Sequence, residues 1–200
     1  MMPLSSLEKA YIPQIETHPA PLPPLKNHPL ILEIGPGRGD FLFQLAEENP
    51  RHFILAIEYK NRRYEKLVQR IEKRRLANVL LVKGEARFVL KSYLKDILFE
   101  KVFILFSDPW PKKRHAKHRL IEAEFLSLLS RLMCPGGELI VTTDDESYAQ
   151  WMQREFEKVP CLLPTDKKDQ YPTIFETFYA QKWKGEGRSL NAFCFVNGPY

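Results

Sequence analysis

Acidic residues stand at the ends of three successive apolar runs in the first half of the sequence. Glu33 lies at the end of the first run, Glu58 closes the second, and Glu85 follows the third. The carboxyl ends of parallel strands meet at one edge of an open α/β sheet, where ligands bind. A carboxylate there can accept hydrogen bonds from ribose hydroxyls or pair with an ammonium group. The pattern is therefore compatible with a ligand that carries a ribose.

A glycine-rich loop follows the first run and reads Glu33-Ile-Gly-Pro-Gly-Arg-Gly-Asp40. Gly35, Gly37 and Gly39 permit positive φ and a close approach of the backbone to a ligand. A dinucleotide-binding fingerprint would need another glycine where Asp40 stands. An acidic residue followed by Gly-x-Gly-x-Gly instead resembles the first motif of class I S-adenosylmethionine-dependent methyltransferases, whose cofactor has no pyrophosphate. The alternative is a plain tight turn. The acids that end all three runs favour a cofactor site.

A stiff aromatic and basic segment follows the apolar run 102–106. Two prolines flank Trp110 in Asp108-Pro-Trp-Pro111, and five cations and two histidines follow within residues 112–119. An exposed tryptophan could stack on a flat base, which contributes ~1–3 kcal/mol, and the cations could contact phosphates. The alternative is a solvated basic turn with Trp110 packed in the core. The position after a strand favours a functional loop.

The positive charge of the chain is concentrated in two segments. The 200 residues carry a net charge of +5, of which residues 112–119 supply +5 and residues 60–75 supply +6, so the remainder sums to −6. Residues 112–119 suit a polyanionic partner. Residues 60–75 have the apolar spacing of an amphipathic helix, and their charges either face solvent or extend the contact with RNA.

Composition excludes several protein classes. The longest strongly apolar run, Val102–Phe106, is far shorter than the ~20 residues of a membrane span, and no apolar signal region precedes it. Three widely spaced cysteines, Cys134, Cys161 and Cys194, suggest neither a metal site nor a disulfide framework. We expect a cytoplasmic protein with no bound metal and no membrane contact.

Apolar runs alternate with amphipathic segments from Leu30 onward. Strands are expected at 30–34, 53–57, 79–82, 102–106 and 138–142, and helices at 41–48, 60–75 and 119–133. This alternation predicts an α/β fold with an open parallel sheet and helices on both faces. Residues 177–183 and 190–196 predict a C-terminal antiparallel hairpin. Seven of the 16 prolines lie in residues 1–29, which predicts an extended arm before a single domain at 30–200.

The segment from Asp108 to Arg119 closely resembles the signature of the bacterial tRNA (guanine-N7-)-methyltransferase family. The resemblance extends from Leu30 to Val196 and includes Glu33-Ile-Gly, Thr143-Asp144 and Thr173-Ile-Phe-Glu176. It implies a Rossmann-like class I methyltransferase fold with a mostly parallel, seven-stranded sheet. It also implies methyl transfer from S-adenosyl-L-methionine to N7 of a guanosine in the tRNA variable loop, position 46 in tRNA numbering, with S-adenosyl-L-homocysteine as product.

The resemblance further implies a role for each matching residue, with Asp108 as the catalytic carboxylate. Methyl-donor contacts are expected from Glu33, Gly35, Gly37, Gly39, Glu58, Glu85, Ala86 and Asp108. Substrate contacts are expected from Lys112, Asp144, Thr173, Ile174, Phe175 and Glu176, and RNA contacts from Arg114, His115, Lys117, His118 and Arg119. Three positions depart from the residues usual in the family, namely Glu85 for Asp, His118 for Arg and Ile174 for Lys.

Three other classes are alternatives to this hypothesis. An adenine-amino methyltransferase would normally carry Asn/Asp-Pro-Pro-aromatic, where this chain has Trp110 and Pro111. A nicotinamide oxidoreductase would need the missing glycine spacing. A non-enzymatic RNA-binding module would have no reason to keep carboxylates at three strand ends. The sequence does not distinguish a monomer from a homodimer.

Overall fold

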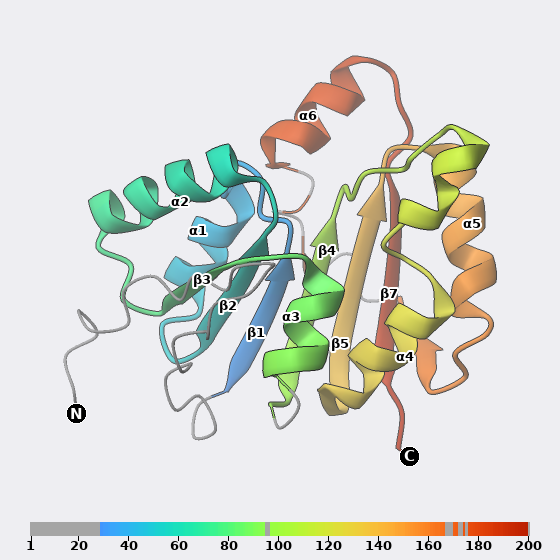
Figure 1. The fold of residues 1–200 in the computed structure, drawn as a ribbon, viewed down its shortest axis with the longest axis horizontal. Coiled ribbons are helices and arrows are strands. Elements are labelled where there is room, and N and C mark those ends of the chain that lie inside the picture. Colours follow the sequence, from blue (N-terminus) through green and yellow to red (C-terminus); the bar gives the residue numbers. More distant parts are fainter. Residues whose placement is uncertain (1–28, 95–96, 167–169, 172–173, 175, 200) are drawn as a thin grey trace. The chain divides into compact units, whose positions relative to one another are not determined.

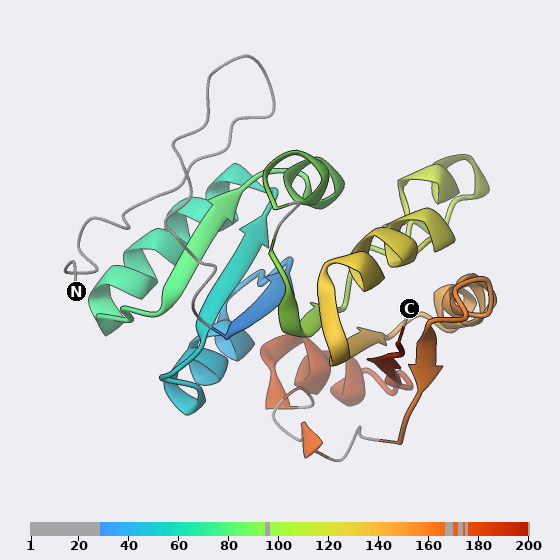
Figure 2. The same cartoon turned by 90° about the horizontal axis from the view of Figure 1, so that it is seen from below.

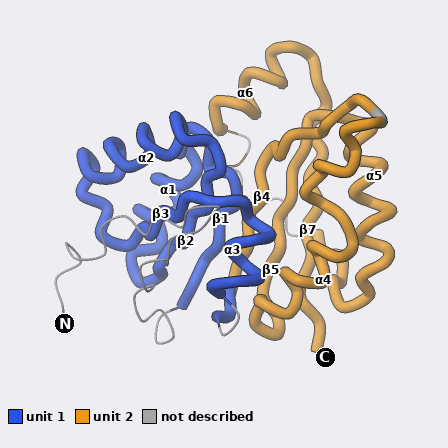
Figure 3. Tube along the Cα trace, in the orientation of Figure 1, with its two compact units in different colours: residues 1–100 blue, residues 101–200 orange. Residues whose placement is uncertain are grey.

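The computed structural model describes residues 29–94, 97–166, 170–171, 174 and 176–199. Its strands form a seven-stranded sheet in the order β3-β2-β1-β4-β5-β7-β6 (Figure 1). The chain divides into two compact units, residues 1–100 and 101–200 (Figure 3). The α/β fold predicted from the sequence is confirmed. The proline-rich arm lies outside the described residues except for Pro29.

The first unit consists of strands and helices in strict alternation. Its elements are β1 (Leu30–Ile34), α1 (Asp40–Glu48), β2 (Phe53–Glu58), α2 (Asn61–Arg74), β3 (Val79–Lys83) and α3 (Ala86–Tyr93). β2 pairs in parallel with β1 and with β3, and α1 and α2 pack on these strands (Figure 2). Every residue of β1 is buried, as expected for a parallel strand covered on both faces.

The second unit holds the antiparallel part of the sheet. The strand β4 (Phe99–Leu105) crosses the boundary between the units, and it is followed by a 3₁₀-helix (Lys113–His118), α4 (Ala123–Arg131), β5 (Met133–Thr143), α5 (Glu146–Phe156), β6 (Leu162–Pro164), α6 (Phe178–Gly185) and β7 (Asn191–Asn197). β7 runs antiparallel to β5 and to β6. Because Thr143 pairs with Asn191, the end of β5 lies beside the segment that enters β7.

The predicted hairpin of residues 177–183 with 190–196 is wrong in its first arm. Residues 178–185 form helix α6, whose N-terminus is capped by Thr177 because its Oγ1 accepts a hydrogen bond from Ala180 N at 3.3 Å. Aromatic residues gave this stretch the composition of a strand. The rings of Tyr179 and Trp183 stack one helical turn apart instead, with centroids 6.3 Å apart. β7 has its antiparallel partners in β5 and β6.

The predicted helix 119–133 is also shorter than expected. α4 begins only at Ala123, where the backbone N–H donates to Glu155 Oε2 at 2.8 Å. This cap comes from α5, 32 residues away in sequence, so no local pattern could place it. At the other end, Met133 already belongs to β5.

Within the ranges that the structure describes, no helix is both long and apolar enough to cross a bilayer. The same residues contain no group of three His, Cys, Asp or Glu side chains placed to hold a metal ion. Cys134, Cys161 and Cys194 form no disulfide in this part of the chain, and of the three Cys194 is buried.

Gly39, which precedes α1, occupies a position with no room for a side chain. Its φ is +81°, and an added Cβ would lie 2.5 Å from Leu67 Cδ2 and 2.8 Å from Phe43 Cζ. Gly35 has a similar φ of +75°, but a Cβ there would meet nothing within 4 Å in the described part of the chain. We expect Gly39→Ala to lower the free energy of unfolding by about 2–4 kcal/mol. Gly35→Ala should cost only the backbone strain, about 1–2 kcal/mol.

Urea denaturation followed by circular dichroism would compare the two glycine variants directly. We expect the larger loss of unfolding free energy in Gly39→Ala, because its added methyl group overlaps neighbouring side chains. Equal losses for the two substitutions would show that packing against α2 does not select glycine at position 39.

Candidate active site

The loop between β1 and α1 wraps around the carboxylate of Glu58. Gly37 N donates to Glu58 Oε2 at 3.2 Å, and Lys60 N donates to Oε1 at 2.8 Å. Gly35, Gly37 and Gly39 all have positive φ, which lets three alternate residues turn without steric cost. The Glu58 side chain is buried. The structure thus brings the glycine loop and the second predicted carboxylate together.

Glu33, in β1, is a buried carboxyl group that lacks a full set of partners. Its side chain is 2% exposed, and Oε2 has no hydrogen-bond partner among the described residues. Burial, and then the nearby carboxylates of Glu58 and Asp40, raise the pKa of Glu33 from 4.5 to about 8. An uncompensated buried carboxylate is costly, and such groups cluster at functional sites. A cationic ligand would supply the missing partner.

Gly35, which follows Glu33 by two residues in the glycine loop, has free space beside its Cα. A Cβ at Gly35 would meet no described atom within 4 Å, although Gly35 N is fixed by a 2.9 Å hydrogen bond to Ile57 O. A rigid backbone with free space on one side is the arrangement that close approach of a ligand requires. Both features fit the ammonium-bearing methyl donor expected from the sequence.

Glu85, the third predicted carboxylate, caps a helix. Its Oε2 accepts a hydrogen bond from Phe88 N at 2.9 Å, and its Oε1 lies 3.3 Å from Arg87 Nη1. The side chain is 34% exposed, whereas Ala86 beside it is buried. The capping role accounts for the position of this carboxylate, and its contact with a ligand stays a prediction.

The Asp-Pro-Trp-Pro loop follows β4 in an unusual backbone conformation. Phe106 and Trp110 have φ values of 52° and 45°, a region that bulky side chains rarely adopt and that recurs at active sites. Asp108 is exposed, and Trp110 is 37% exposed. The alternative in which Trp110 packs in the core is therefore wrong. Its ring instead contacts two histidines, with centroids 5.8 Å from His115 and 5.2 Å from His118.

The basic segment divides into exposed and buried side chains. Lys112, Arg114, Lys117 and His118 are exposed, and His115 is half-buried. Arg119 is only 9% exposed, so little of its side chain is open to solvent, and its expected contact with RNA stays a prediction. Its Nε donates to Pro109 O at 2.9 Å, so this cation is bonded to the backbone of the Asp-Pro-Trp-Pro loop.

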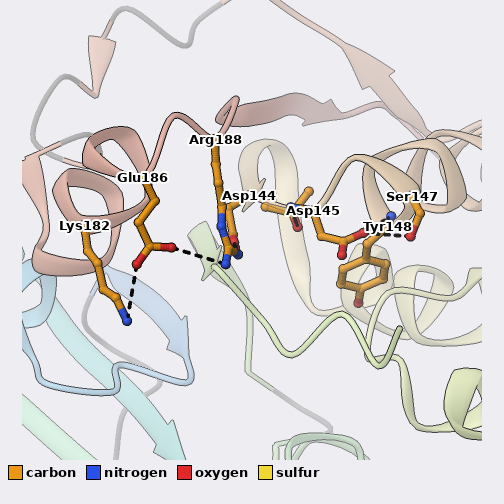
Figure 4. A network of polar contacts seen from close by, with 8 residues as sticks. Asp144, Asp145, Ser147, Tyr148, Lys182, Glu186 and Arg188 are labelled. Atoms are coloured by element: carbon orange, nitrogen blue, oxygen red, sulfur yellow. Dashed lines mark hydrogen bonds and ion pairs between the residues drawn. The ribbon is translucent and has the colours of Figure 1, made fainter. Parts of the chain in front are cut away.

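Asp144, directly after β5, forms an ion pair that the sequence did not reveal. Arg188 Nη1 lies 2.5 Å from Asp144 Oδ2, and Arg188 Nη2 lies 3.3 Å from Glu186 Oε2 (Figure 4). The guanidinium also stands 4.0 Å from the ring centroid of Trp183. Arg188 lies between the two arms of the predicted hairpin, 177–183 and 190–196, and that prediction gives it no role beyond the connection. The antiparallel pairing of β5 with β7 brings Asp144 and Arg188 together.

The predicted substrate segment 173–176 is described at two of its four positions. Thr173 and Phe175 lie outside the described residues. Ile174 is 1% exposed, so its side chain is closed to a ligand and its predicted substrate contact is not supported. Glu176 is exposed and stays a candidate.

Comparison with known proteins relates the chain to methyltransferases. A family model described as "Putative methyltransferase" matches residues 27–192. Three relatives carry the name tRNA (guanine-N(7)-)-methyltransferase. They come from Syntrophotalea carbinolica (44% identical, covering 62% of this chain and 53% of the relative), Chlamydia caviae (30%, 82% and 74%) and Paramagnetospirillum magneticum (36%, 85% and 73%). The match spans about half the length of the first of these relatives.

Solved structures of methyltransferases share the fold. The 16S rRNA methyltransferase KamB superposes with a TM-score of 0.61 at 14% identity, over 86% of this chain and 88% of that chain. The antibiotic-resistance methyltransferase Kmr gives 0.57 at 15% identity, over 94% and 98%. At these identities the likeness establishes the class I methyltransferase fold alone, as the sequence predicted.

Proposed function

Because the chain belongs to the tRNA (guanine-N(7)-)-methyltransferase family, we propose that it methylates N7 of a guanosine in the tRNA variable loop, position 46 in tRNA numbering. The methyl donor is S-adenosyl-L-methionine, and the products are 7-methylguanosine and S-adenosyl-L-homocysteine. The observation that carries this proposal is the exposed Asp108 beside exposed Trp110, in a strained loop that leads into exposed cations. That loop provides, in one short segment, an aromatic ring on which a flat base can stack, a negative charge and cations that can contact phosphates.

The reaction needs positioning more than it needs proton transfer. Guanine N7 carries a free sp² lone pair, so no general base has to activate it. The donor supplies an electrophilic methyl group, and a new N7–C bond forms as the S–C bond breaks. The protein must hold N7 about 3 Å from the methyl carbon and in line with the leaving sulfur. Positive charge moves onto the purine, where the Asp108 carboxylate would stabilise it.

Residues of the first unit would hold the donor. Glu33 would pair with the donor's ammonium group, since its buried Oε2 lacks a partner among the described residues. Glu58 would accept hydrogen bonds from the ribose hydroxyls, because the backbone N–H groups of Gly37 and Lys60 already fix its orientation. The open face of Gly35 would let the donor approach the backbone.

Residues of the second unit would hold the RNA. Trp110 would stack on a base, and the exposed cations Lys112, Arg114 and Lys117 would contact phosphates. Asp144, paired with Arg188, would contact the guanosine. We also propose that residues 30–200 act as one methyltransferase domain and that the protein meets its tRNA substrate in the cytoplasm.

Incubation with unmodified tRNA and radiolabelled methyl donor, followed by digestion to nucleosides, tests the proposal. We expect the label in 7-methylguanosine. Label in another nucleoside would assign the protein to a different base methyltransferase. Donor and tRNA binding without any transfer would instead support an RNA-binding module.

A further inference from the structure

Arg119 has surroundings unlike those of the cations that precede it. The residue is buried, and its guanidinium lies over two aromatic rings of α5, with Cζ 5.2 Å from the centroid of Tyr148 and 5.0 Å from that of Trp151. Its Nε donates to Pro109 O at 2.9 Å. The planar guanidinium can thus stack on rings while an in-plane N–H donates, which the ammonium group of lysine cannot do.

The two rings are themselves fixed to the chain on either side of the basic segment. The Tyr148 hydroxyl accepts a hydrogen bond from Ile121 N at 3.2 Å and lies 3.5 Å from Ser107 Oγ. Trp151 Nε1 donates to Ile121 O at 2.8 Å. Tyr148 is fully buried. The binding place of the guanidinium is therefore defined by α5 and by the backbone at Ile121.

The carbonyl that Arg119 holds lies in the middle of the strained loop. Pro109 stands between Asp108 and Trp110, and Trp110 has a positive φ. At the start of the loop Phe106, also with positive φ, is fixed by its N–H, which donates to Thr142 O at 3.0 Å. Unfavourable backbone conformations persist only where the surroundings enforce them. The hydrogen bond from Arg119 to Pro109 O lies where it can provide that constraint, in the middle of the loop.

We propose that Arg119 is a positioning residue for the Asp-Pro-Trp-Pro loop, and that it sets the placement of Asp108 and Trp110 through the Pro109 carbonyl. Its catalytic consequence rests on the proposed function, whereas its effect on loop conformation does not. The basic segment then has two roles. Its exposed cations face the RNA, and its buried arginine shapes the loop that carries the carboxylate.

Arg119→Lys keeps the charge but loses the in-plane donor and the stacking. We expect kcat for methyl transfer to fall about 10–100-fold, because a misplacement of about 1 Å costs on the order of 10² in rate. KM for tRNA and its salt dependence should change little. The matched variant Lys117→Ala removes an exposed cation of the same segment. It should raise KM for tRNA and reduce the salt slope by about one.

A fluorine NMR spectrum of protein labelled with 5-fluorotryptophan reports the loop independently of activity. The chain has three tryptophans, and Trp→Phe variants assign their resonances. Arg119→Lys should shift the Trp110 resonance and leave that of Trp183 in place. If Arg119→Lys does not fold, Trp151→Phe, which keeps the arginine and removes the bond to Ile121 O, should shift the same Trp110 resonance.

An unshifted Trp110 resonance together with wild-type kcat would overturn the positioning role. A loss of salt slope in Arg119→Lys equal to that in Lys117→Ala would overturn it too, because it would indicate a phosphate contact. Wild-type protein without methyl transfer would refute the proposed function. A shifted Trp110 resonance would in that case still support the structural role of Arg119.

Discussion

Asp108→Asn is expected to lower kcat for tRNA methylation by roughly 10²–10³-fold, the usual effect of losing one electrostatic contact to a transition state. Asparagine keeps the shape of the side chain and one hydrogen-bond acceptor but removes the negative charge. Methylation at N7 places positive charge on the purine, so that charge is needed most in the transition state. Single-turnover rates at saturating tRNA and donor would isolate this step from binding.

The fold of the Asp108 variant should be intact, because the side chain is exposed. The free energy of unfolding is expected to stay within about 0.5 kcal/mol of wild type. Glu157→Gln, which neutralises an exposed carboxylate at the end of α5, is the matched control and should keep the wild-type rate. An Asp108→Asn rate within threefold of wild type would remove this carboxylate from the reaction.

Glu33→Gln is expected to weaken binding of the methyl donor and to abolish its dependence on pH. In the donor-free protein the pKa of Glu33 is raised to about 8, chiefly by burial. A cationic donor binds the ionised carboxylate, so below pH 8 binding must first release a proton. Donor affinity should therefore rise by up to about tenfold per pH unit between pH 6 and 8 and level off above it.

Isothermal titration calorimetry in two buffers of different ionisation enthalpy would count the released protons. Wild type should release close to one proton at pH 6.5, and Glu33→Gln should release none from this site. Glu65→Gln, at an exposed position of α2, should behave as wild type. Equal affinities and equal proton release for wild type and Glu33→Gln would place the donor elsewhere.

The same carboxyl group should affect stability in the absence of donor. Its folded-state pKa lies above the ordinary value of 4.5, so the folded protein binds more protons than the unfolded chain between these two values. The free energy of unfolding should therefore fall as pH rises from about 5 to 8, by at most roughly 4–5 kcal/mol. Glu33→Gln should lose this decrease and be the more stable protein at pH 8.

The first half of the fold was predictable because its determinants are local. Apolar runs of five or six residues followed by glycine or an acid place β1 and β2 without tertiary information. Gly39 is required both by its own φ and by close packing. The acids at the strand ends were found for the same reason.

The second half depends on contacts between distant residues. α4 begins where Glu155 of α5 caps it, and α6 replaced a predicted strand because a helix cap outweighed aromatic composition. Arg119 is a cation like its exposed neighbours Arg114 and Lys117, and its contacts with the rings of α5 and with Pro109 O distinguish it. The pairing of Arg188 with Asp144 likewise depends on the register of β5 and β7.

A tRNA transcript with 7-deazaguanosine at position 46 tests the central claim most directly, because it replaces the accepting nitrogen by a C–H group and changes little else. The unmodified transcript should accept one methyl group, recovered as 7-methylguanosine. The 7-deaza transcript should bind with similar affinity and accept none. Methylation of both transcripts to the same extent would show that N7 of this guanosine is not the acceptor and would contradict the proposed function.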